Sequence, residues 1–357
     1  MKIAILSFYS GLNERGVERW VLELATKLSK CNQVKVFQNN KNQKSNKYNI
    51  ESAGVDFDPE IKERKLDITR RAFLHYQGRK IAQFTIKIFP KLWIQNYDLI
   101  ISTDGGWESA FVRILTWLKG KKMVIVGHSG IGWDDLNNLY CFPDVFVALS
   151  SKALRWAKKI NTFVKSVYIP DGVDLNMFNK TGEKVEIGLP KPIILMVGAP
   201  EKGKRMELAI NAVAKLKDPS LLILGGGYNE KNIRMVGKTK LGKRFLMKKV
   251  EFNEIPKYYR SCSLFTLPSW ENEAFGMVYI EAMASGLPVV ATDDELRREI
   301  IGEAGILVNP TDLDAYSTAL QKALETAWHD KPVIQAKKFS WDFVVGEYEK
   351  LFKELVS

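Results

Sequence analysis

Two glutamates with a glycine between them offer the first recognisable chemistry in this sequence, in the stretch Glu273-Ala274-Phe275-Gly276-Met277-Val278-Tyr279-Ile280-Glu281. The pattern from Gly276 to Ala284 predicts a helix. The first amides of a helix have no partner within it, and they favour an anion such as phosphate. We expect free amides at Phe275, Gly276, Met277 and Val278. Gly276 has no side chain, so an anion can approach the backbone closely.

The two glutamates lie on either side of this anion seat. Glu273 precedes the helix in a loop, and Glu281 lies about 7.5 Å along the helix from Gly276, at a rise of about 1.5 Å per residue. Ionised carboxylates accept hydrogen bonds from hydroxyl groups. An anion seat between two such acceptors fits a diphosphate with a sugar at each end, which describes a nucleotide-sugar.

The flanking sequence predicts the elements that position this loop. The apolar run Leu264–Leu267 is typical of a buried parallel strand that stops at Pro268. Gly286 and Pro288 end the helix, and Val289–Ala291 predicts the next strand. The loop therefore follows the carboxyl end of a strand, where doubly wound sheets bind their ligands.

These residues resemble the retaining glycosyltransferases of the GT-B fold, specifically glycosyltransferase family 4, also called glycosyl transferases group 1. The family signature has two glutamates separated by seven residues, as Glu273 and Glu281 are, and the ending Ala282-Met283-Ala284-Ser285-Gly286-Leu287-Pro288-Val289-Val290 also fits it. The resemblance covers residues 193 to 325 well and is thin over residues 39 to 97. It implies that Glu273 is catalytic and that Glu281 binds the ribose of the donor.

Basic residues follow another predicted strand, Ile193–Val197, in the segment Gly198-Ala199-Pro200-Glu201-Lys202-Gly203-Lys204-Arg205. In the resembled family a lysine at the start of the next helix binds the donor phosphates. Lys204 matches that lysine, whereas Ala199 stands where an arginine is usual and Arg205 replaces a glycine. The leaving diphosphate gains charge as the glycosidic bond breaks, so a cation aimed at it stabilises the transition state more than the ground state. We expect Lys204, then Arg205, to do this.

The first half of the chain offers further candidates at strand ends. Gly16 begins a predicted helix, and its amide could reach the same diphosphate. The family has two glycines here, and Arg15, which takes the place of the first, could itself meet phosphate. His128 follows a predicted strand, and in the resembled family a histidine at this place contacts the transferred sugar. The loop Ser102–Trp107 is expected to line the acceptor side.

Length and patterning predict two α/β domains. The chain has 357 residues, of which 46% are hydrophobic, enough for buried sheets. Apolar strand runs alternate with amphipathic helical patterns, which is typical of parallel sheets covered on both faces. We expect two Rossmann-like doubly wound domains facing each other across a cleft, the GT-B architecture. Their bounds are 1–171, completed by a C-terminal helix over 339–357, and 172–338, and the crossing near Pro170–Asp174 resembles the family's link.

Several features argue against other classes of protein. Three scattered cysteines predict neither a disulfide framework nor a zinc site, as is typical of a reducing compartment. No apolar run is as long as a membrane span, and the first residues lack the features of a signal peptide, so we expect a cytoplasmic protein. The pairs Asp134-Asp135 and Asp293-Asp294 are interpreted as helix caps rather than metal ligands.

The net charge of +12 is unevenly distributed. Thr69–Leu92 contains six basic residues and no acidic one. The apolar and aromatic residues between them are Phe73, Tyr76, Phe84, Ile88 and Phe89. Such a segment fits an anionic membrane surface and would hold the protein at the inner face of the cytoplasmic membrane. A helix that buries these side chains in a core and exposes a basic face explains the pattern equally well.

The resemblance thus implies a retaining hexosyltransferase that needs neither a metal nor a cofactor. Its catalytic candidates are Glu273, His128 and Lys204, and its donor is a UDP- or GDP-linked sugar. The expected acceptor is a hydroxyl of a glycan or lipid-linked glycan in cell-envelope polysaccharide synthesis, and no nucleic acid partner is expected. The alternatives are a GT-B sugar-nucleotide epimerase and a non-enzymatic basic protein that binds membrane or nucleic acid. The first needs an acid–base set that the sequence does not display, and the second leaves the pair Glu273 and Glu281 unexplained.

Overall fold

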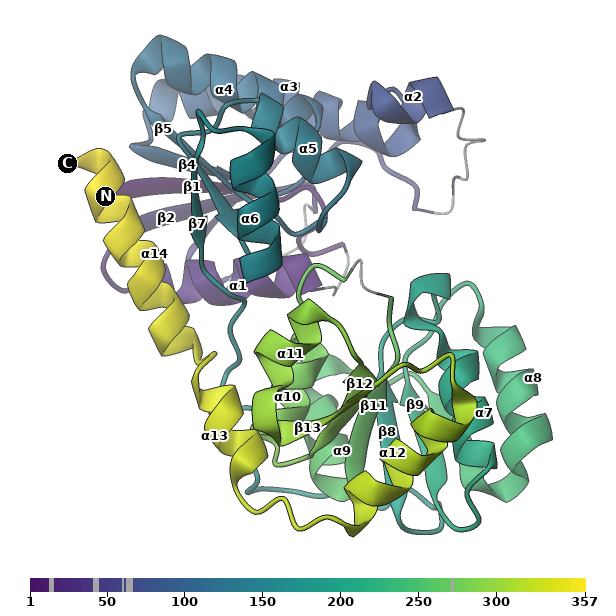
Figure 1. The fold of residues 1–357 in the computed structure, drawn as a ribbon. Helices are drawn as coiled ribbons and strands as arrows, with labels where there is room; N and C mark the ends of the chain where they lie inside the picture. The colour runs from purple at the N-terminus through teal and green to yellow at the C-terminus, as the bar shows by residue number, and fades with distance from the viewer. Residues whose placement is uncertain (13–15, 41–44, 60, 62–66, 271–272) are drawn as a thin grey trace. The chain divides into compact units, whose positions relative to one another are not determined.

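The computed structural model describes residues 1–12, 16–40, 45–59, 61, 67–270 and 273–357. The chain divides into two compact units (Figure 1). The first consists of Met1–Asp171 together with Asp342–Ser357, and the second is Gly172–Trp341. Each unit is described by itself below.

The sheet of the first unit is parallel and has the strand order β3-β2-β1-β4-β5-β6-β7. Its strands are β1 (Lys2–Leu6), β2 (Gln33–Gln38), β3 (Asn49–Ser52), β4 (Leu99–Ser102), β5 (Lys122–Val126), β6 (Val145–Ala148) and β7 (Lys165–Tyr168). Its helices are α1 (Gly16–Leu28), α2 (Asp67–Arg71), α3 (Tyr76–Gln95), α4 (Trp107–Lys119), α5 (Trp133–Tyr140) and α6 (Ser151–Ile160). The last helix, α14 (Trp341–Val356), returns to this unit, where the ring of Tyr348 lies 5.8 Å from that of Trp20 on α1.

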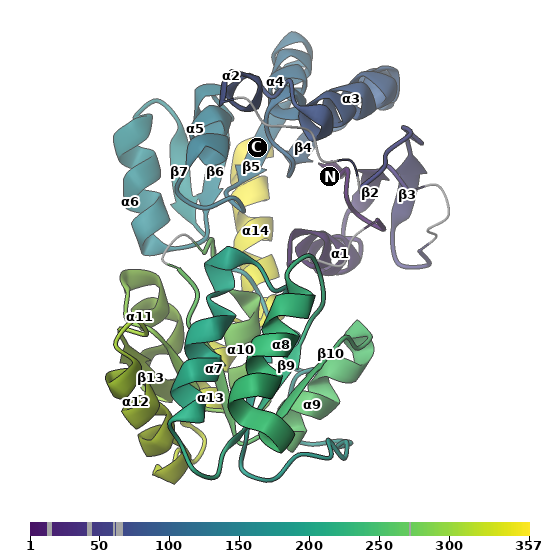
Figure 2. The same ribbon diagram turned by 90° about the vertical axis from the view of Figure 1, so that its right-hand side faces the viewer.

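The sheet of the second unit is also parallel, with the order β10-β9-β8-β11-β12-β13. Its strands are β8 (Ile193–Val197), β9 (Ser220–Leu224), β10 (Phe245–Lys248), β11 (Leu264–Leu267), β12 (Val289–Thr292) and β13 (Gly305–Val308). Its helices are α7 (Met206–Ala214), α8 (Glu230–Leu241), α9 (Ile255–Ser261), α10 (Met277–Ala284), α11 (Glu295–Ile301), α12 (Leu313–Glu325) and α13 (Lys331–Lys337). Helices α7 and α8 run side by side in this unit (Figure 2).

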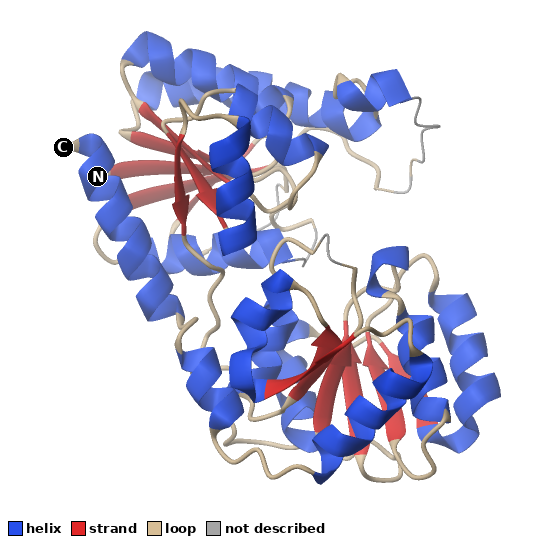
Figure 3. Cartoon of the chain, in the orientation of Figure 1, coloured by secondary structure: helices blue, strands red, loops and turns tan. Residues whose placement is uncertain are grey.

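Each sheet is surrounded by helices (Figure 3), and its central strands are buried, as β8 and β11 are along their whole length. The sequence predicts this doubly wound α/β fold class, and the structure confirms the prediction. The direction in which the strand order grows reverses between β1 and β4 in the first sheet and between β8 and β11 in the second. Sheets of this kind bind ligands outside the carboxyl ends of the strands at such a reversal.

One segment of the first unit differs from the prediction. The four-residue edge strand β3 begins at Asn49 and is not among the strands that the sequence predicts, and Asn39, which precedes it, is buried. Beyond the ends of β2 and β3, the side chain of Asn39 makes the hydrogen bonds in place of a backbone pair. Its Nδ2 donates to the carbonyl of Val55 at 2.8 Å, and its Oδ1 accepts from the amide of Val55 at 2.6 Å. A strand with a single aliphatic residue, Ile50, gives no periodic apolar signal.

Candidate functional site

Lys204 and Glu273 meet at the strand reversal of the second sheet. Lys204 ends the short 3₁₀ helix Lys202–Lys204 after β8, and Glu273 lies in the loop between β11 and α10. The Nζ of Lys204 lies 2.8 Å from Oε1 and 2.6 Å from Oε2 of Glu273. The two side chains are 21% and 19% exposed. The structure thus brings together two predicted catalytic residues and leaves both within reach of solvent.

The start of α10 lies beside this pair. Gly276 caps the helix with φ 91° and ψ 64°, a left-handed conformation that favours glycine. A Cβ added at Gly276 would lie 2.7 Å from the ring of Tyr279 and 3.5 Å from Cγ of Glu273. The amides of the four predicted positions, Phe275 to Val278, donate no hydrogen bond to any described residue. Because Gly276 is only partly covered, these free amides form the kind of anion seat that the sequence predicts.

Arg205 ties the loop after β8 to the loop after β11. Its Nε donates to the carbonyl of Pro268 at 2.6 Å, and its Nη2 donates to the carbonyl of Ser269 and to Oγ1 of Thr292, both at 3.0 Å. The amide of Trp270 also donates to the carbonyl of Gly203 at 2.9 Å. Arg205 therefore positions the two loops. The phosphate contact predicted for it would fall to Nη1, which has no hydrogen-bond partner among the described residues.

Arg297 is a residue of this site that the sequence did not indicate. It lies on α11, is fully buried, and pairs with Asp294. Its Nη2 donates to Oγ of Ser269 at 2.5 Å and to the carbonyl of Trp270 at 2.8 Å. Asp294 also caps α11 by accepting from the amide of Arg297, as the paired aspartates predicted. Arg297 thus fixes the loop that leads to Glu273, by contacts too distant in sequence to leave a local pattern.

Glu281 faces a neighbouring helix. Glu281 is 6% exposed, and its Oε2 accepts a hydrogen bond from the hydroxyl of Tyr259 on α9 at 3.2 Å. Burial first, and then the charge of Glu281, raise the pKa of Tyr259 well above its ordinary value, so Tyr259 remains a donor. The ribose contact expected of Glu281 stays a prediction, and Tyr259 already uses one of its oxygens.

Part of the chain that contains this site is similar in sequence to a known protein family. Residues 178–338 match the family described as glycosyl transferases group 1. The match lies in the second half of the chain. The matched range contains the residues described above, from Lys204 to Arg297, and the resemblance stated from the sequence is confirmed.

Individual proteins extend the comparison. A phosphatidyl-myo-inositol mannosyltransferase from Mycolicibacterium smegmatis is 32% identical over 221 residues, which are 58% of this chain and 56% of that relative. The chain spans about half the length, or less, of the curated relatives it matches. A sucrose-phosphate synthase structure from Thermosynechococcus elongatus has a TM-score of 0.80 at 20% identity, covering 99% of this chain and 98% of that one. The Anabaena protein HepE in complex with UDP and glucose has a TM-score of 0.75 at 16% identity, covering 99% and 100%. These structures share the GT-B fold.

Outside the part that matches the group 1 family, His128 follows β5 in the first unit. Its ring meets that of Trp20 edge to face, with centroids 4.7 Å apart. Its Nε2 is buried and has no hydrogen-bond partner among the described residues. Burial lowers the pKa of His128 to about 3, so the imidazole is neutral near pH 7. A neutral imidazole nitrogen without a partner suits a hydroxyl ligand, and the sugar contact stays a prediction.

Two other candidates of the first unit lie at the start of α1. Gly16 is the first residue of this helix and is exposed. Arg15 lies outside the described residues, as does Glu271 in the second unit. The structure therefore leaves the predicted phosphate contacts of Gly16 and Arg15 as predictions.

Two carboxyl groups, those of the partly buried Asp104 and the fully buried Glu108, lie at the strand reversal of the first sheet. Asp104 follows β4, and its Oδ2 accepts from the amide of Phe8, after β1, at 2.6 Å. Oε1 of Glu108 accepts from Oγ of Ser102 at 2.7 Å, and its Oε2 has no partner among the described residues. Burial raises the pKa of Asp104 to about 7 and raises that of Glu108 well above its ordinary value. The predicted loop Ser102–Trp107 thus contains Asp104, whose carboxyl group, together with that of Glu108 on α4, holds a proton near neutral pH.

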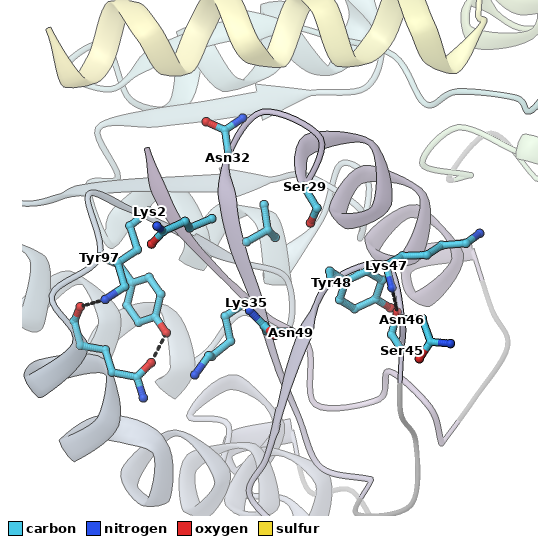
Figure 4. Close-up of a pocket in the computed structure, with 13 residues that line it drawn as sticks. Lys2, Ser29, Asn32, Lys35, Ser45, Asn46, Lys47, Tyr48, Asn49 and Tyr97 are labelled. Atoms are coloured by element: carbon cyan, nitrogen blue, oxygen red, sulfur yellow. Dashed lines mark hydrogen bonds between the residues drawn. The ribbon is translucent and has the colours of Figure 1, made fainter.

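A separate hollow of about 580 Å³ lies at the opposite edge of the first sheet (Figure 4). It opens beside the first residues of β1, β2 and β3, which are Lys2, Gln33 and Asn49. Figure 4 shows Lys35 and Tyr97 among its lining side chains. Ligands of doubly wound sheets bind at the carboxyl edge, so this hollow is not the candidate site. In the part of the chain that the structure describes, no group of three or more His, Cys, Asp or Glu side chains could hold a metal ion.

Proposed function

We propose that this group 1 family member is a retaining glycosyltransferase, which moves a sugar from a nucleoside-diphosphate donor to a hydroxyl of a glycan or lipid-linked glycan. The observation that carries the proposal is the pair Lys204–Glu273 beside the free amides at the start of α10. One cluster of loops contains a cation, a row of backbone donors and a carboxylate. The cation and the backbone donors suit the phosphate groups of a nucleotide-sugar, and the carboxylate suits the hydroxyls of its sugar.

The diphosphate would lie at the start of α10, where Gly276 allows close approach. When the bond from the sugar's anomeric carbon to the phosphate oxygen breaks, its electron pair stays on that oxygen. Lys204 and the amides are placed to stabilise the charge that develops there. This supply of positive charge is why we propose chemistry without a metal ion.

The acceptor hydroxyl would attack the anomeric carbon from the side that the diphosphate leaves, and thereby retain its configuration. The departing phosphate oxygen would take the proton of the acceptor, so no protein base is required. Glu273 accepts hydrogen bonds only, when ionised, and would hold hydroxyls of the transferred sugar while it orients Lys204. His128, neutral at pH 7, is proposed to contact the transferred sugar.

The relatives support the substrate classes in this proposal. HepE was solved in complex with UDP and glucose, and the M. smegmatis relative is named for a phosphatidyl-myo-inositol acceptor. We propose a UDP- or GDP-linked donor and an acceptor in the cell envelope.

The test is transfer or slow hydrolysis of UDP- and GDP-sugars by the full chain, with Lys204→Ala and Lys215→Ala as a matched pair. Lys215 follows α7 and pairs with Asp314 on the surface. We expect Lys204→Ala to lower kcat about 10²- to 10³-fold, as removal of one transition-state donor does, and Lys215→Ala to leave it unchanged. Conversion of the donor to its epimer without transfer, or equal activity of the two variants, would overturn the proposal.

A further inference from the structure

Helix α4 exposes apolar side chains to solvent, although it also buries Val112 and Leu115 in the core. Ile114, Trp117 and Leu118 are 49%, 62% and 69% exposed. Glu108, Ser109 and Thr116 on the same helix are buried. A surface helix of a globular unit normally carries polar and charged side chains on its outer face. Something other than water is therefore expected to cover the outer face of α4.

Helix α3 lies beside α4 and extends this face (Figures 1 and 2). Ile86, Trp93 and Ile94 are 58%, 40% and 78% exposed, at spacings that place them on one side of the helix. Nζ of Lys119, at the end of α4, donates to the carbonyl of Trp93 at 2.7 Å. We call these side chains the α3–α4 face: Ile86, Trp93, Ile94, Ile114, Trp117 and Leu118.

The α3–α4 face differs from the surface suggested by the sequence. Of the apolar residues in Thr69–Leu92, Phe84 and Ile88 are buried in the core of the first unit, and Tyr76 stacks on Phe57. For these residues the core-facing interpretation is the one that the structure supports. Five of the six residues of the α3–α4 face lie beyond Leu92 in sequence, and the sixth, Ile86, is not among the residues that the sequence analysis names.

The exposed charges on α3 and α4 themselves have one sign, although two of them pair with carboxylates of neighbouring segments, Lys91 with Glu51 and Arg113 with Asp144. The two helices carry a single carboxyl group, that of Glu108, which is fully buried. Lys87 and Lys119 donate to backbone carbonyls, those of Gly54 and Trp93, so no described carboxylate neutralises them. A second copy of the chain would bring the same positive charges against them, whereas anionic lipid headgroups would neutralise them.

We propose that the α3–α4 face docks the protein on a bilayer that contains anionic lipid. Trp93 and Trp117 have the amphipathic rings that are enriched at headgroup level. The aliphatic side chains between them would enter the boundary of the acyl chains, with the lysines at the phosphate groups. Since this inference concerns binding alone, it does not depend on the sugar-transfer chemistry.

Co-sedimentation of the full chain with vesicles tests the proposal. One set of vesicles is phosphatidylcholine, and the other contains about one third phosphatidylglycerol, because anionic lipid is expected to strengthen binding. We expect binding to the anionic vesicles and a loss of at least about tenfold in affinity for the double variant Trp117→Gln, Leu118→Gln. The matched control is Met235→Gln, Ile334→Gln, which removes exposed apolar side chains from the second unit and should bind as the unchanged chain does.

A charge variant, Lys87→Gln with Lys119→Gln, should weaken binding to anionic vesicles and leave the weak binding to phosphatidylcholine unaltered. Equal melting temperatures for all variants would show that folding is preserved. Failure of the full chain to bind anionic vesicles would refute the proposal. So would an equal loss of affinity in the variant of the α3–α4 face, Trp117→Gln, Leu118→Gln, and in the control variant of the second unit. So would a dimer in solution that Trp117→Gln, Leu118→Gln converts to a monomer without any vesicle binding.

Discussion

The ammonium group of Lys204 is 2.6 Å from a carboxylate oxygen of Glu273, although the two residues are 69 positions apart in the sequence. They come from the loops after β8 and β11, the strands between which the sheet order reverses. Arg205 and Arg297 hold these loops in place through the carbonyls of Pro268, Ser269 and Trp270. The pair is thus a product of sheet topology, and it can be tested as a unit.

Glu273→Gln should lower kcat about 10²-fold or more, since it removes the charge that orients Lys204 and leaves the side-chain shape intact. The double variant with Lys204→Ala should lose little more than Lys204→Ala alone, because the two groups act together. Steady-state kinetics of the four proteins completes the cycle. Strictly additive losses would mean that the two residues act separately.

Glu281→Gln should weaken donor binding with little effect on kcat, because its proposed partner, the ribose, does not change during the reaction. We expect a rise of about tenfold in the Kd of the nucleotide-sugar, as for a lost charge-assisted hydrogen bond. Tyr259→Phe removes the hydroxyl that donates to Glu281 and is the matched control. Calorimetric titration with UDP- and GDP-sugars measures both, and an equal rise in Kd for Tyr259→Phe would indicate that Glu281 acts through packing alone.

Gly276→Ala should destabilise the second unit by about 1–3 kcal/mol, the usual cost of a strained backbone position. The residue has φ 91°, and a Cβ would lie 2.7 Å from the ring of Tyr279. Gly346→Ala is the control, because a Cβ at this position of α14 meets no atom within 4 Å and the helix gains about 0.5–1 kcal/mol. Urea denaturation compares the two, and equal stability would contradict the tight turn at Gly276.

Asp171→Asn should change the pH dependence of stability. Asp171 is buried, its Oδ1 has no partner among the described residues, and burial raises its pKa from 3.8 to about 7. The folded protein therefore keeps a proton that the unfolded chain loses near pH 4, so this residue's contribution to stability is complete below about pH 4 and is lost as the pH rises through about 7. A shift of this size corresponds to roughly 4 kcal/mol at most.

Asparagine cannot ionise, so the Asn variant should gain stability relative to the unchanged chain between about pH 5 and about pH 8.5. Melting temperatures of both proteins across this range provide the measurement. The other carboxyl groups with a raised pKa, those of Asp104, Glu108 and Asp135, are common to both proteins and cancel in the difference. Parallel pH profiles would show that Asp171 does not titrate in the folded state as described.

Much of the fold could be predicted because strands and helix ends leave local patterns. The run Leu264–Leu267 and the glycine at 276 define β11 and the start of α10 from neighbouring residues alone. Short edge strands such as β3, with one aliphatic residue, leave no such pattern and were missed. The same limit hid Arg297, whose partners lie about a helix and a strand away in sequence and meet it only in the folded unit.

The sequence by itself determined the fold class, the family that the second half resembles and the residues that could bind a sugar diphosphate, because these depend on residue type and spacing along the chain. The tertiary structure decided which side of each helix is covered. Phe84 of α3 is buried in the core, whereas Trp117 of α4 is exposed. Glu281 accepts a hydrogen bond from Tyr259, which lies on another helix. Burial depends on what packs against a side chain, and the neighbours that decide it are set by sheet order rather than by adjacent residues.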